Sequence, residues 1–245
     1  MTAHVSVLRE GDMTHVHLSR PEKLNAFSEA LVEGLASAVE AAGRDGTRLL
    51  VFSGEGKGFS GGFDLDGLDE MTDGDLMLRF IRVEEMLQAV YHAPVITLGL
   101  AHGACYGAAA DLFSACHFRV AAPGTRFRMP GPKFGVVLGT RRLEGLVGAD
   151  AARLLLFRDG PFDCNEALTC GYVQDIEPQE HWPGVIASVL DTATTLDGDV
   201  TRRITGRLST DNRDADMAAL VRSVSHGSIK SRVAGYIEAM RAKRG

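Results

Sequence analysis

Two glycine-rich loops, each directly after a short apolar run, constrain the fold of this chain more than any other feature. RLLVFSG at 48–54 runs into a loop that ends GGFDLDG, and VITLGL at 95–100 runs into AHGACYG. Apolar runs of this length, bounded by glycine, are typical of strands buried on both faces of a sheet. Each loop leads into a helical pattern, so the sequence predicts strands that alternate with helices, which is an α/β fold.

The rest of the chain adds predicted elements before and after these loops. It opens with a hairpin of strands at 5–8 and 13–18, and Ser28 is expected to cap a first helix. A second helix begins at Asp73 or Asp75. The stretch FRMPGPKFGVVLG has too many proline and glycine residues for a regular element. The remaining predicted elements are strands at 118–122 and 172–176 and helices at 141–147, 149–157 and 165–169.

The C-terminal part of the chain is predicted to be helical. The strand patterns end at about residue 199, which divides a core of residues 1–198 from a helical region of residues 199–245. Helical spacing in that region places five apolar residues in one stripe, Ile229, Val233, Tyr236, Ile237 and Met240. Such a stripe covers either the chain's own core or a neighbouring subunit, and the spacing alone does not decide between them.

Composition and cysteine spacing disfavour several classes of protein. The net charge of −6 argues against a nucleic-acid binder, and no apolar run reaches the ~20 residues of a membrane-spanning helix. The N-terminus lacks the basic and then apolar layout of a signal peptide. The four cysteines form no CxxC pair, and their spacing is typical of neither a zinc site nor a disulfide framework. We therefore expect a cytoplasmic protein without a metal site.

The two glycine-rich loops point to a chemical role for the main chain. Glycine lets the backbone approach a ligand closely, and the first N–H groups of a helix have no partner inside the helix. Two such N–H groups aimed at one point hold a carbonyl oxygen as it gains negative charge. The plain alternative is that both loops are ordinary tight turns. Neither matches a P-loop or a clean GxGxxG fingerprint, so nucleotide binding is disfavoured.

Three segments occur together in a fixed order along the chain. They are RPEKLNAF at 20–27, GKGFSGGFDLDGL at 56–68 and AHGACYGAAADL at 101–112. In this combination the chain resembles the enoyl-CoA hydratase/isomerase (crotonase) family over about residues 4–175. The resemblance implies a spiral of β-β-α units followed by helices that build a homotrimer or a dimer of trimers. It also implies an acyl-CoA thioester as substrate, with coenzyme A as part of the substrate and no other cofactor.

The resemblance implies roles for particular residues. The main-chain N–H groups of Phe63 and Ala108, the latter directly after Gly107, would form an oxyanion hole for the thioester oxygen. Phe63 is larger than the alanine common at that position and is expected to narrow the acyl pocket. Two further sets match the family's coenzyme A contacts and the border of the same pocket, namely Lys23, Leu24 and Ala26, and Asp64, Leu65 and Asp66.

Asp111 matches the first of two glutamates that hydratases of this family place beside the double bond, and Gly131 stands where the second would be. Water addition uses both carboxylates, so the resemblance favours an isomerase or a hydratase-like step of altered specificity, with Asp111 as acid/base. Two alternatives stay open: decarboxylation or C–C bond cleavage within the same family, and a non-catalytic acyl-CoA binder. Asp111 could equally be a structural carboxylate paired with Arg119, Arg128 or His102.

Several other polar residues near these motifs are weaker candidates. Arg128 or Lys133 could bind a second carboxylate on the acyl group, or be a solvated surface charge. Lys230 and Arg232 could contact coenzyme A phosphates across a subunit boundary. Asp66 or Asp69 could supply a second polar group beyond Phe63. Packing of the loop is the simpler role for three residues before Ala108, which are His102, Cys105 and Tyr106.

Overall fold

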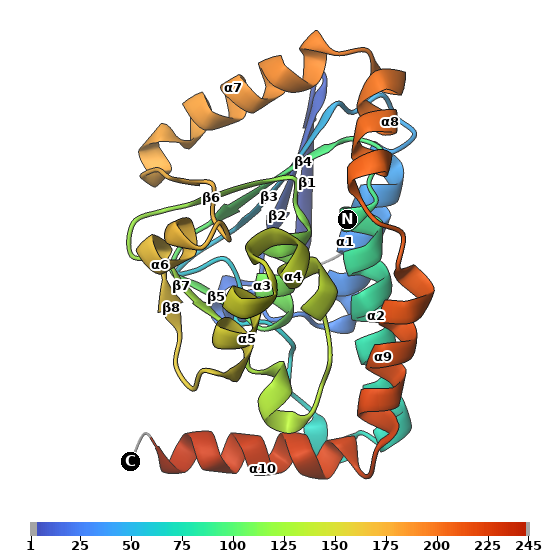
Figure 1. Cartoon of the computed structure of the whole chain (residues 1–245), viewed down its shortest axis with the longest axis vertical. Coiled ribbons are helices and arrows are strands. Elements are labelled where there is room, and N and C mark those ends of the chain that lie inside the picture. The colour runs from blue at the N-terminus through green and yellow to red at the C-terminus, as the bar shows by residue number, and fades with distance from the viewer. Residues whose placement is uncertain (1–3, 244–245) are drawn as a thin grey trace.

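A six-stranded sheet forms the centre of the molecule, which a computed structural model describes over residues 4–243 (Figure 1). Its strands lie in the order β1-β2-β3-β4-β6-β9. β1 pairs antiparallel with β2, and the other neighbours are parallel. The bounds are β1 Val5–Glu10, β2 Met13–Leu18, β3 Leu49–Gly54, β4 Ile96–Ala101, β6 Phe118–Ala121 and β9 Asp175–Ile176. The predicted hairpin and both predicted buried strands are therefore confirmed.

A second, three-stranded sheet contains part of the second glycine-rich loop. It consists of β5 (Ala104–Tyr106), β7 (Arg126–Arg128) and β8 (Phe162–Asp163). The prediction that FRMPGPKFGVVLG lacks regular structure is wrong for its first two residues, which end β7, and for the 3-10 turn η3 (Gly131–Phe134). The central residues of β5 and β7 are fully buried, and this packing outweighs the local turn signals.

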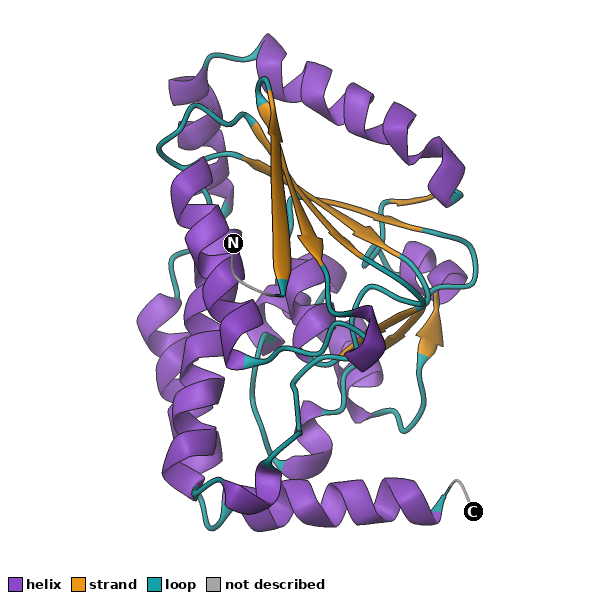
Figure 2. Cartoon of the chain, turned by 180° about the vertical axis from the view of Figure 1, so that it is seen from behind, coloured by secondary structure: helices purple, strands orange, loops and turns teal. Residues whose placement is uncertain are grey.

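Helices cover both faces of the large sheet (Figure 1, Figure 2). On one face α1 (Glu29–Ala42), α2 (Asp73–Tyr91) and α3 (Ala108–Ala115) enclose the main apolar core. On the other face α7 (Trp182–Thr195), a helix that the sequence did not predict, packs against β3 and β4. A sheet covered on both faces explains why its central strands read as continuous apolar runs.

The first two helices begin as predicted, α1 after the cap Ser28 and α2 at Asp73. The side chain of Ser28 accepts a hydrogen bond from the N–H of Leu31 at the start of α1. Thr72 and Asp75 form a reciprocal capping box at the start of α2. The apolar faces predicted for these two helices are buried in the structure, at Leu31, Leu35, Ala38, Val39 and Ala42 in α1 and at Leu76, Phe80, Val83, Leu87 and Val90 in α2.

The middle of the chain forms three short helices and one strand that is shorter than predicted. The helices are α4 (Thr140–Val147), α5 (Ala149–Phe157) and α6 (Cys164–Thr169), close to their predicted bounds. The strand predicted at 172–176 is wrong for its first three residues, because β9 begins at Asp175. Tyr172 is fully buried, and its hydroxyl donates a hydrogen bond to the Ala110 carbonyl oxygen at 2.6 Å. This side chain anchors the segment in the core before it joins the sheet.

Three helices complete the described chain, α8 (Gly198–Leu208), α9 (Arg213–Ser225) and α10 (Ile229–Ala242). α9 packs along α2, and α10 runs across one end of the molecule against α2 and η3 (Figure 1). Ile229 and Val233 of the predicted stripe are buried in an apolar cluster with residues of α2. The stripe therefore covers its own chain. Between residues 4 and 243, no helix has the length and apolar character needed to cross a membrane.

A buried ion pair joins α2 to α4. Nη1 and Nη2 of Arg142 lie 2.9 and 2.6 Å from the two carboxylate oxygens of Glu84, and the side chains are 4% and 1% exposed. Nε2 of Gln88 donates a further hydrogen bond to this carboxylate at 2.9 Å. Separating such a pair leaves a buried charge without a partner, so the pair fixes the position of α4 and of Gly139 before it.

Loss of this pair is expected to destabilise the fold far more than loss of its exposed neighbour. Glu84→Gln should lower the free energy of unfolding by about 3–5 kcal/mol, because Arg142 stays charged and buried. Glu85→Gln is the matched control, since Glu85 is half exposed and pairs with Arg82, and it should cost less than about 1 kcal/mol. Urea denaturation followed by circular dichroism measures both, and equal losses would contradict this assignment.

Candidate active site

The two glycine-rich loops lie side by side and touch through their main chains. The N–H of Ser60 donates to the Ala104 carbonyl oxygen, and the N–H of Tyr106 donates to the Ser60 carbonyl oxygen, both at 3.0 Å. Gly62 follows with a φ of +89°. A Cβ at Gly62 would overlap the Tyr106 carbonyl oxygen and lie 3.4 Å from the nitrogen of Ala108. The absence of a side chain at Gly62 is what allows this close approach.

Two main-chain N–H groups beside this contact donate to no acceptor within residues 4–243. Phe27 donates to the Gly62 carbonyl oxygen at 2.7 Å and accepts the N–H of Asp64 at 3.3 Å. In this parallel pattern the N–H of Phe63 itself points away from Phe27. Ala108 is the first residue of α3, so its N–H has no partner inside the helix. Both residues line one cavity, as an oxyanion hole requires.

The side chain of Phe63 restrains the main chain that carries its N–H. The ring stacks on that of Phe80 with centroids 4.4 Å apart, and the guanidinium of Arg79 lies over the Phe63 ring, 4.4 Å from its centroid. Arg79 is buried and donates a hydrogen bond to the Phe27 carbonyl oxygen at 3.3 Å. Stacking and cation–π contacts on the same ring limit its rotation. Phe63 is thus an anchor as well as part of the cavity wall.

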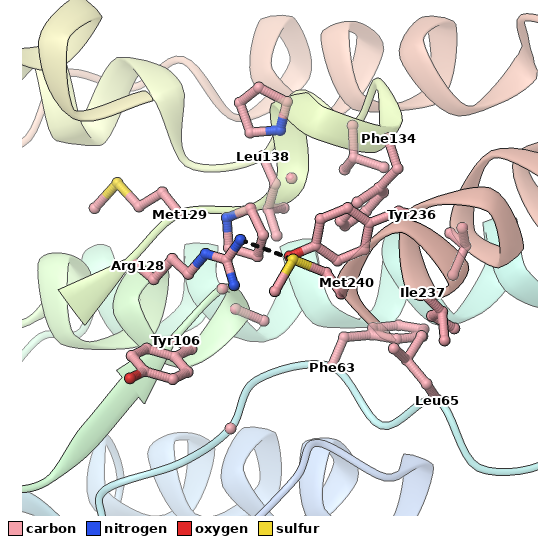
Figure 3. A pocket seen from close by; sticks show the side chains of 18 of the residues that line it. Phe63, Leu65, Tyr106, Arg128, Met129, Phe134, Leu138, Tyr236, Ile237 and Met240 are labelled. Carbon is pink, nitrogen blue, oxygen red and sulfur yellow. Dashed lines mark hydrogen bonds between the residues drawn. The ribbon is translucent and has the colours of Figure 1, made fainter. Parts of the chain in front are cut away.

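A cavity of about 360 Å³ opens beside these N–H groups (Figure 3). Its wall is mostly apolar and comes from the loop after β3, from α2, from the segment 128–138 and from α10. Tyr236, Ile237 and Met240 of the predicted C-terminal stripe are part of this wall. Asp111 supplies the one carboxyl among the described lining residues. Within residues 4–243, no cluster of three His, Cys, Asp or Glu side chains could hold a metal ion.

Asp111 lies in the first turn of α3 and keeps some exposure toward the cavity. A Cβ on Gly139, whose φ is +65°, would overlap the carboxyl oxygen Oδ1 of Asp111, so the start of α4 closes over this group. Burial raises the pKa of the Asp111 carboxyl to about 7, and the charge of Arg142 opposes that rise. No donor in the described chain hydrogen-bonds to the carboxyl oxygens of Asp111. Such a carboxyl can exchange a proton near neutral pH.

The residues considered as structural partners of Asp111 bond elsewhere. Arg119, Arg128 and His102 each hydrogen-bond to main-chain carbonyl oxygens, at distances between 2.8 and 3.3 Å. Neither arginine forms an ion pair with a carboxylate of the described residues. The interpretation of Asp111 as a carboxylate paired with one of these three residues is therefore wrong.

Gly131 lines the cavity at the point where the resemblance places a second carboxylate. It is the first residue of η3, between two prolines. A Cβ at this position would lie 3.3 Å from the Val136 carbonyl oxygen, so the turn is folded tightly around the missing side chain. Because position 131 carries no carboxylate, Asp111 is the single acid in the described wall of the cavity.

Lys23, Leu24 and Ala26 lie in and just after the 3-10 turn η1 (Pro21–Lys23). Lys23 forms an exposed ion pair with Asp66 at 2.7 Å, which joins this turn to the loop after β3. Leu24 has a φ of +50°, and a Cβ on Gly61 would lie 3.4 Å from its Cδ2 atom. The segment thus borders the loop that carries Phe63. Its contact with coenzyme A stays a prediction.

Residues 64–66 divide between the cavity and the scaffold. Leu65 lines the cavity. Asp64 is buried and pairs with Arg20, and its carboxylate also accepts the N–H of Asp66 at 3.0 Å. Asp64 therefore stabilises the turn after Phe63, and it is not among the residues that line the cavity.

The remaining candidates near the second loop and η3 differ in position. Tyr106 and Arg128 line the cavity, whereas Lys133 does not and forms an ion pair with Asp159 at 3.2 Å. Cys105 is fully buried, and this burial raises the pKa of its thiol. A thiol of that kind is a poor nucleophile, because the thiolate is the reactive form.

Basic residues of α10 hold this helix over the cavity. Nζ of Lys230 donates to the main-chain carbonyl oxygens of Asp69 and Met71 at 2.7 and 2.8 Å. Arg232 donates to the Phe134 carbonyl oxygen at 2.9 Å. These bonds explain why α10 forms a wall of the site. Contact of Lys230 or Arg232 with coenzyme A phosphates of a neighbouring subunit stays a prediction.

Two buried polar groups that support the site were missed from the sequence. Nδ2 of Asn25 donates to the carbonyl oxygens of Glu55, Gly58 and Phe59, which ties RPEKLNAF to the first glycine-rich loop. Glu84 and its partner Arg142 on α4 lie close enough for their charges to act on the Asp111 carboxyl. A signal for Glu84 existed, because it falls on the apolar face predicted for α2. Asn25 had no comparable signal, since one amide in a turn is ordinary.

A substitution at Gly62 tests the close approach of the two loops. Gly62→Ala should lower the free energy of unfolding by about 1–3 kcal/mol, because the new Cβ overlaps the Tyr106 carbonyl oxygen at a positive φ. Gly61→Ala is the matched control, since Gly61 has no positive φ and its nearest contact is a leucine methyl group at 3.4 Å. Thermal and urea unfolding measure both, and a harmless Gly62→Ala would refute the contact.

The raised pKa of Asp111 makes the stability of the protein depend on pH. Its pKa moves from 3.8 to about 7 on folding, so the folded state retains a proton that the unfolded state releases between these values. The stability contributed by the protonated form is therefore lost as pH rises from about 4 to about 7. The free energy of unfolding of Asp111→Asn minus that of the parent should therefore increase between pH 4 and pH 8. The expected increase is at least about 1.4 kcal/mol. A pH-independent difference would contradict the raised pKa.

Comparison of the sequence identifies relatives along most of the chain. A model of the enoyl-CoA hydratase/isomerase family matches residues 9–242. A Mycobacterium tuberculosis protein named "Probable enoyl-CoA hydratase echA6" is 34% identical over 66% of this chain and 65% of its own length. The protein of the same name from Mycobacterium leprae is 34% identical over 68% of each chain. The match spans about two thirds of the length of these relatives.

Solved structures extend the similarity to nearly the whole chain. A crystal structure from Bordetella parapertussis, whose name carries the enoyl-CoA hydratase/isomerase assignment, is 44% identical, with a TM-score of 0.94 over 96% of this chain and 98% of that chain. The enoyl-CoA hydratase of Bacillus halodurans is 20% identical, with a TM-score of 0.84 over 95% of this chain and 100% of that chain, and this likeness shows the fold alone. With its crotonase fold and a family model that matches residues 9–242, this chain belongs to the enoyl-CoA hydratase/isomerase family.

Proposed function

We propose that the protein acts on an acyl-CoA thioester through an enolate that two main-chain N–H groups stabilise. The observation that carries this proposal is the pair of free N–H groups, from Phe63 and Ala108, beside a mostly apolar cavity with one carboxyl. The cavity suits an acyl chain, and the N–H groups suit the thioester oxygen. Because only one acid lines the described wall, we propose an isomerase-like or hydratase-like reaction without the second carboxylate of the usual hydratase.

The proposed chemistry assigns one role to each group. The thioester oxygen accepts hydrogen bonds from the N–H groups of Phe63 and Ala108. The Asp111 carboxylate removes a proton from the α-carbon, and the electron pair of that C–H bond moves onto the thioester oxygen as the enolate forms. In an isomerisation, the protonated Asp111 then returns the proton to the γ-carbon, so the double bond moves from the β,γ to the α,β position. One oxyanion donor is worth about 2.7–4 kcal/mol to such a transition state.

The assembly and binding mode follow from the same proposal. Coenzyme A enters as part of the substrate, along the segment of Lys23, Leu24 and Ala26, and no other cofactor is involved. A homotrimer or dimer of trimers in the cytoplasm is the proposed form of the protein. The fit of α10 over the cavity of its own chain supports a site that is largely complete within one subunit.

Substitution of Asp111 tests the acid/base assignment. Asp111→Asn should lower turnover of a 3-enoyl-CoA by at least ~10²-fold, because an amide cannot take the proton. Binding of butyryl-CoA serves as the control and should stay within a few-fold of the parent. In the parent, kcat/KM should rise with pH through about 7, as the carboxylate form becomes populated. Unchanged turnover of the variant would exclude Asp111 as the base.

A panel of three thioesters distinguishes the proposed reaction from its alternatives. Crotonyl-CoA reports hydration, a 3-enoyl-CoA reports isomerisation and a malonyl-type CoA reports decarboxylation. We expect the isomerisation to be fastest and hydration to be slow. Turnover of the malonyl-type thioester alone would favour decarboxylation. Binding of all three without turnover would identify a non-catalytic acyl-CoA binder.

A further inference from the structure

We propose that Arg128 selects acyl groups that carry a second carboxylate at the end remote from the thioester. This inference rests on the proposed function, because it assumes that the cavity holds the acyl chain of a thioester. It concerns a different property of the site, namely which acyl groups bind. Arg128 and Arg241 are the two cationic residues among the described lining residues, and Arg241 is exposed in the last turn of α10, whereas Arg128 is half buried.

The fold places Arg128 next to the proposed oxyanion hole. β7 pairs parallel with β5, and Arg128 lies opposite Tyr106 in that register. The main-chain carbonyl oxygen of Arg128 accepts the N–H of Gly107 at 2.8 Å, one residue before the free N–H of Ala108. The side chain extends from this strand into the cavity, toward Tyr236 and Met240 of α10 (Figure 3). A ligand held at the Ala108 N–H would therefore lie in the same cavity as this guanidinium.

Arg128 forms no ion pair with a carboxylate within residues 4–243. Its Nη2 atom donates to the Asp159 carbonyl oxygen and to the Met240 sulfur, each at 3.3 Å, and its guanidinium lies 5.9 Å from the centroid of the Tyr236 ring. These contacts are long and involve uncharged groups. Arg142 is different, because it is buried against a carboxylate that binds both of its terminal nitrogens.

A carboxylate on the ligand would supply the charged partner that the Arg128 guanidinium does not have in the described chain. A guanidinium has five N–H donors in a planar fork, and a carboxylate accepts two of them in parallel. On its cavity side Arg128 faces a mostly apolar wall, whereas on its outer side it borders a second pocket with Lys133, Asp159 and Lys243. A pair formed inside the cavity would therefore be partly shielded from solvent. A purely hydrocarbon acyl chain would instead place a methyl group beside the cation and remove water from it. The site is therefore expected to discriminate between a terminal methyl group and a terminal carboxylate.

Matched thioesters and a matched variant test this selectivity. Dissociation constants would be measured by calorimetry for succinyl-, glutaryl- and adipyl-CoA and for butyryl-, valeryl- and hexanoyl-CoA, which pair the two end groups at equal chain length. The parent should prefer the carboxylate at one chain length by about ten- to a hundredfold, the range of a charge-assisted hydrogen bond. Arg128→Met should abolish that preference and leave the affinity for the hydrocarbon thioesters within a few-fold.

Two controls make each outcome decisive. Arg126→Met removes an exposed arginine from the same strand, outside the cavity wall, and should preserve the preference. Circular dichroism shows whether each variant is folded. Equal affinity of the parent for both series would overturn the inference while leaving the proposed function intact. An equal loss for both series in Arg128→Met would also overturn it, because it would place Arg128 on the coenzyme A phosphates. Failure of the parent to bind any thioester would overturn both proposals.

Discussion

The contact between the two glycine-rich loops is the constraint on which the rest of the site depends. Each loop leaves a parallel strand of the same sheet, and main-chain hydrogen bonds of Ser60 draw the loops together. Gly62 completes the contact, because any larger residue would collide with the Tyr106 carbonyl oxygen. That approach brings the free N–H groups of Phe63 and Ala108 to one cavity. Main-chain donors held in this way need little rearrangement when charge develops on a ligand oxygen.

Around this centre, the structure separates groups that hold the fold from the group that is free to react. Glu84 and Arg142 satisfy each other in the core, and Asp64 pairs with Arg20 beneath the loop after β3. The carboxyl oxygens of Asp111 accept no hydrogen bond from the described protein, and burial raises the pKa of this carboxyl to about 7. A carboxyl buried in this way reduces stability at neutral pH, whereas a paired one would be too acidic to move a proton. That difference is the physical reason for assigning the chemistry to Asp111.

Much of the fold could be predicted from the sequence, because its strands and helices carry strong local patterns. The apolar faces of α1 and α2, the cap at Ser28 and the start of α2 at Asp73 are of this kind, whereas the cap at Thr72 was not predicted. The strands β5 and β7 could not be predicted, since three-residue strands depend on buried side chains that are distant in sequence. The position of α10 over the cavity could not be predicted either, because an apolar stripe does not indicate which surface it packs against. Only the family resemblance predicted that the cavity would contain a single acid, because it places Gly131 where the second carboxylate would be.

A crystal structure of the protein with hexanoyl-CoA tests the central claim most directly. Such a complex shows where the thioester oxygen lies relative to the two glycine-rich loops. The account predicts that this oxygen lies within about 3.2 Å of the main-chain nitrogens of both Phe63 and Ala108, with the acyl chain in the cavity beside Asp111. A thioester bound elsewhere, or an oxygen that meets neither nitrogen, would contradict the account.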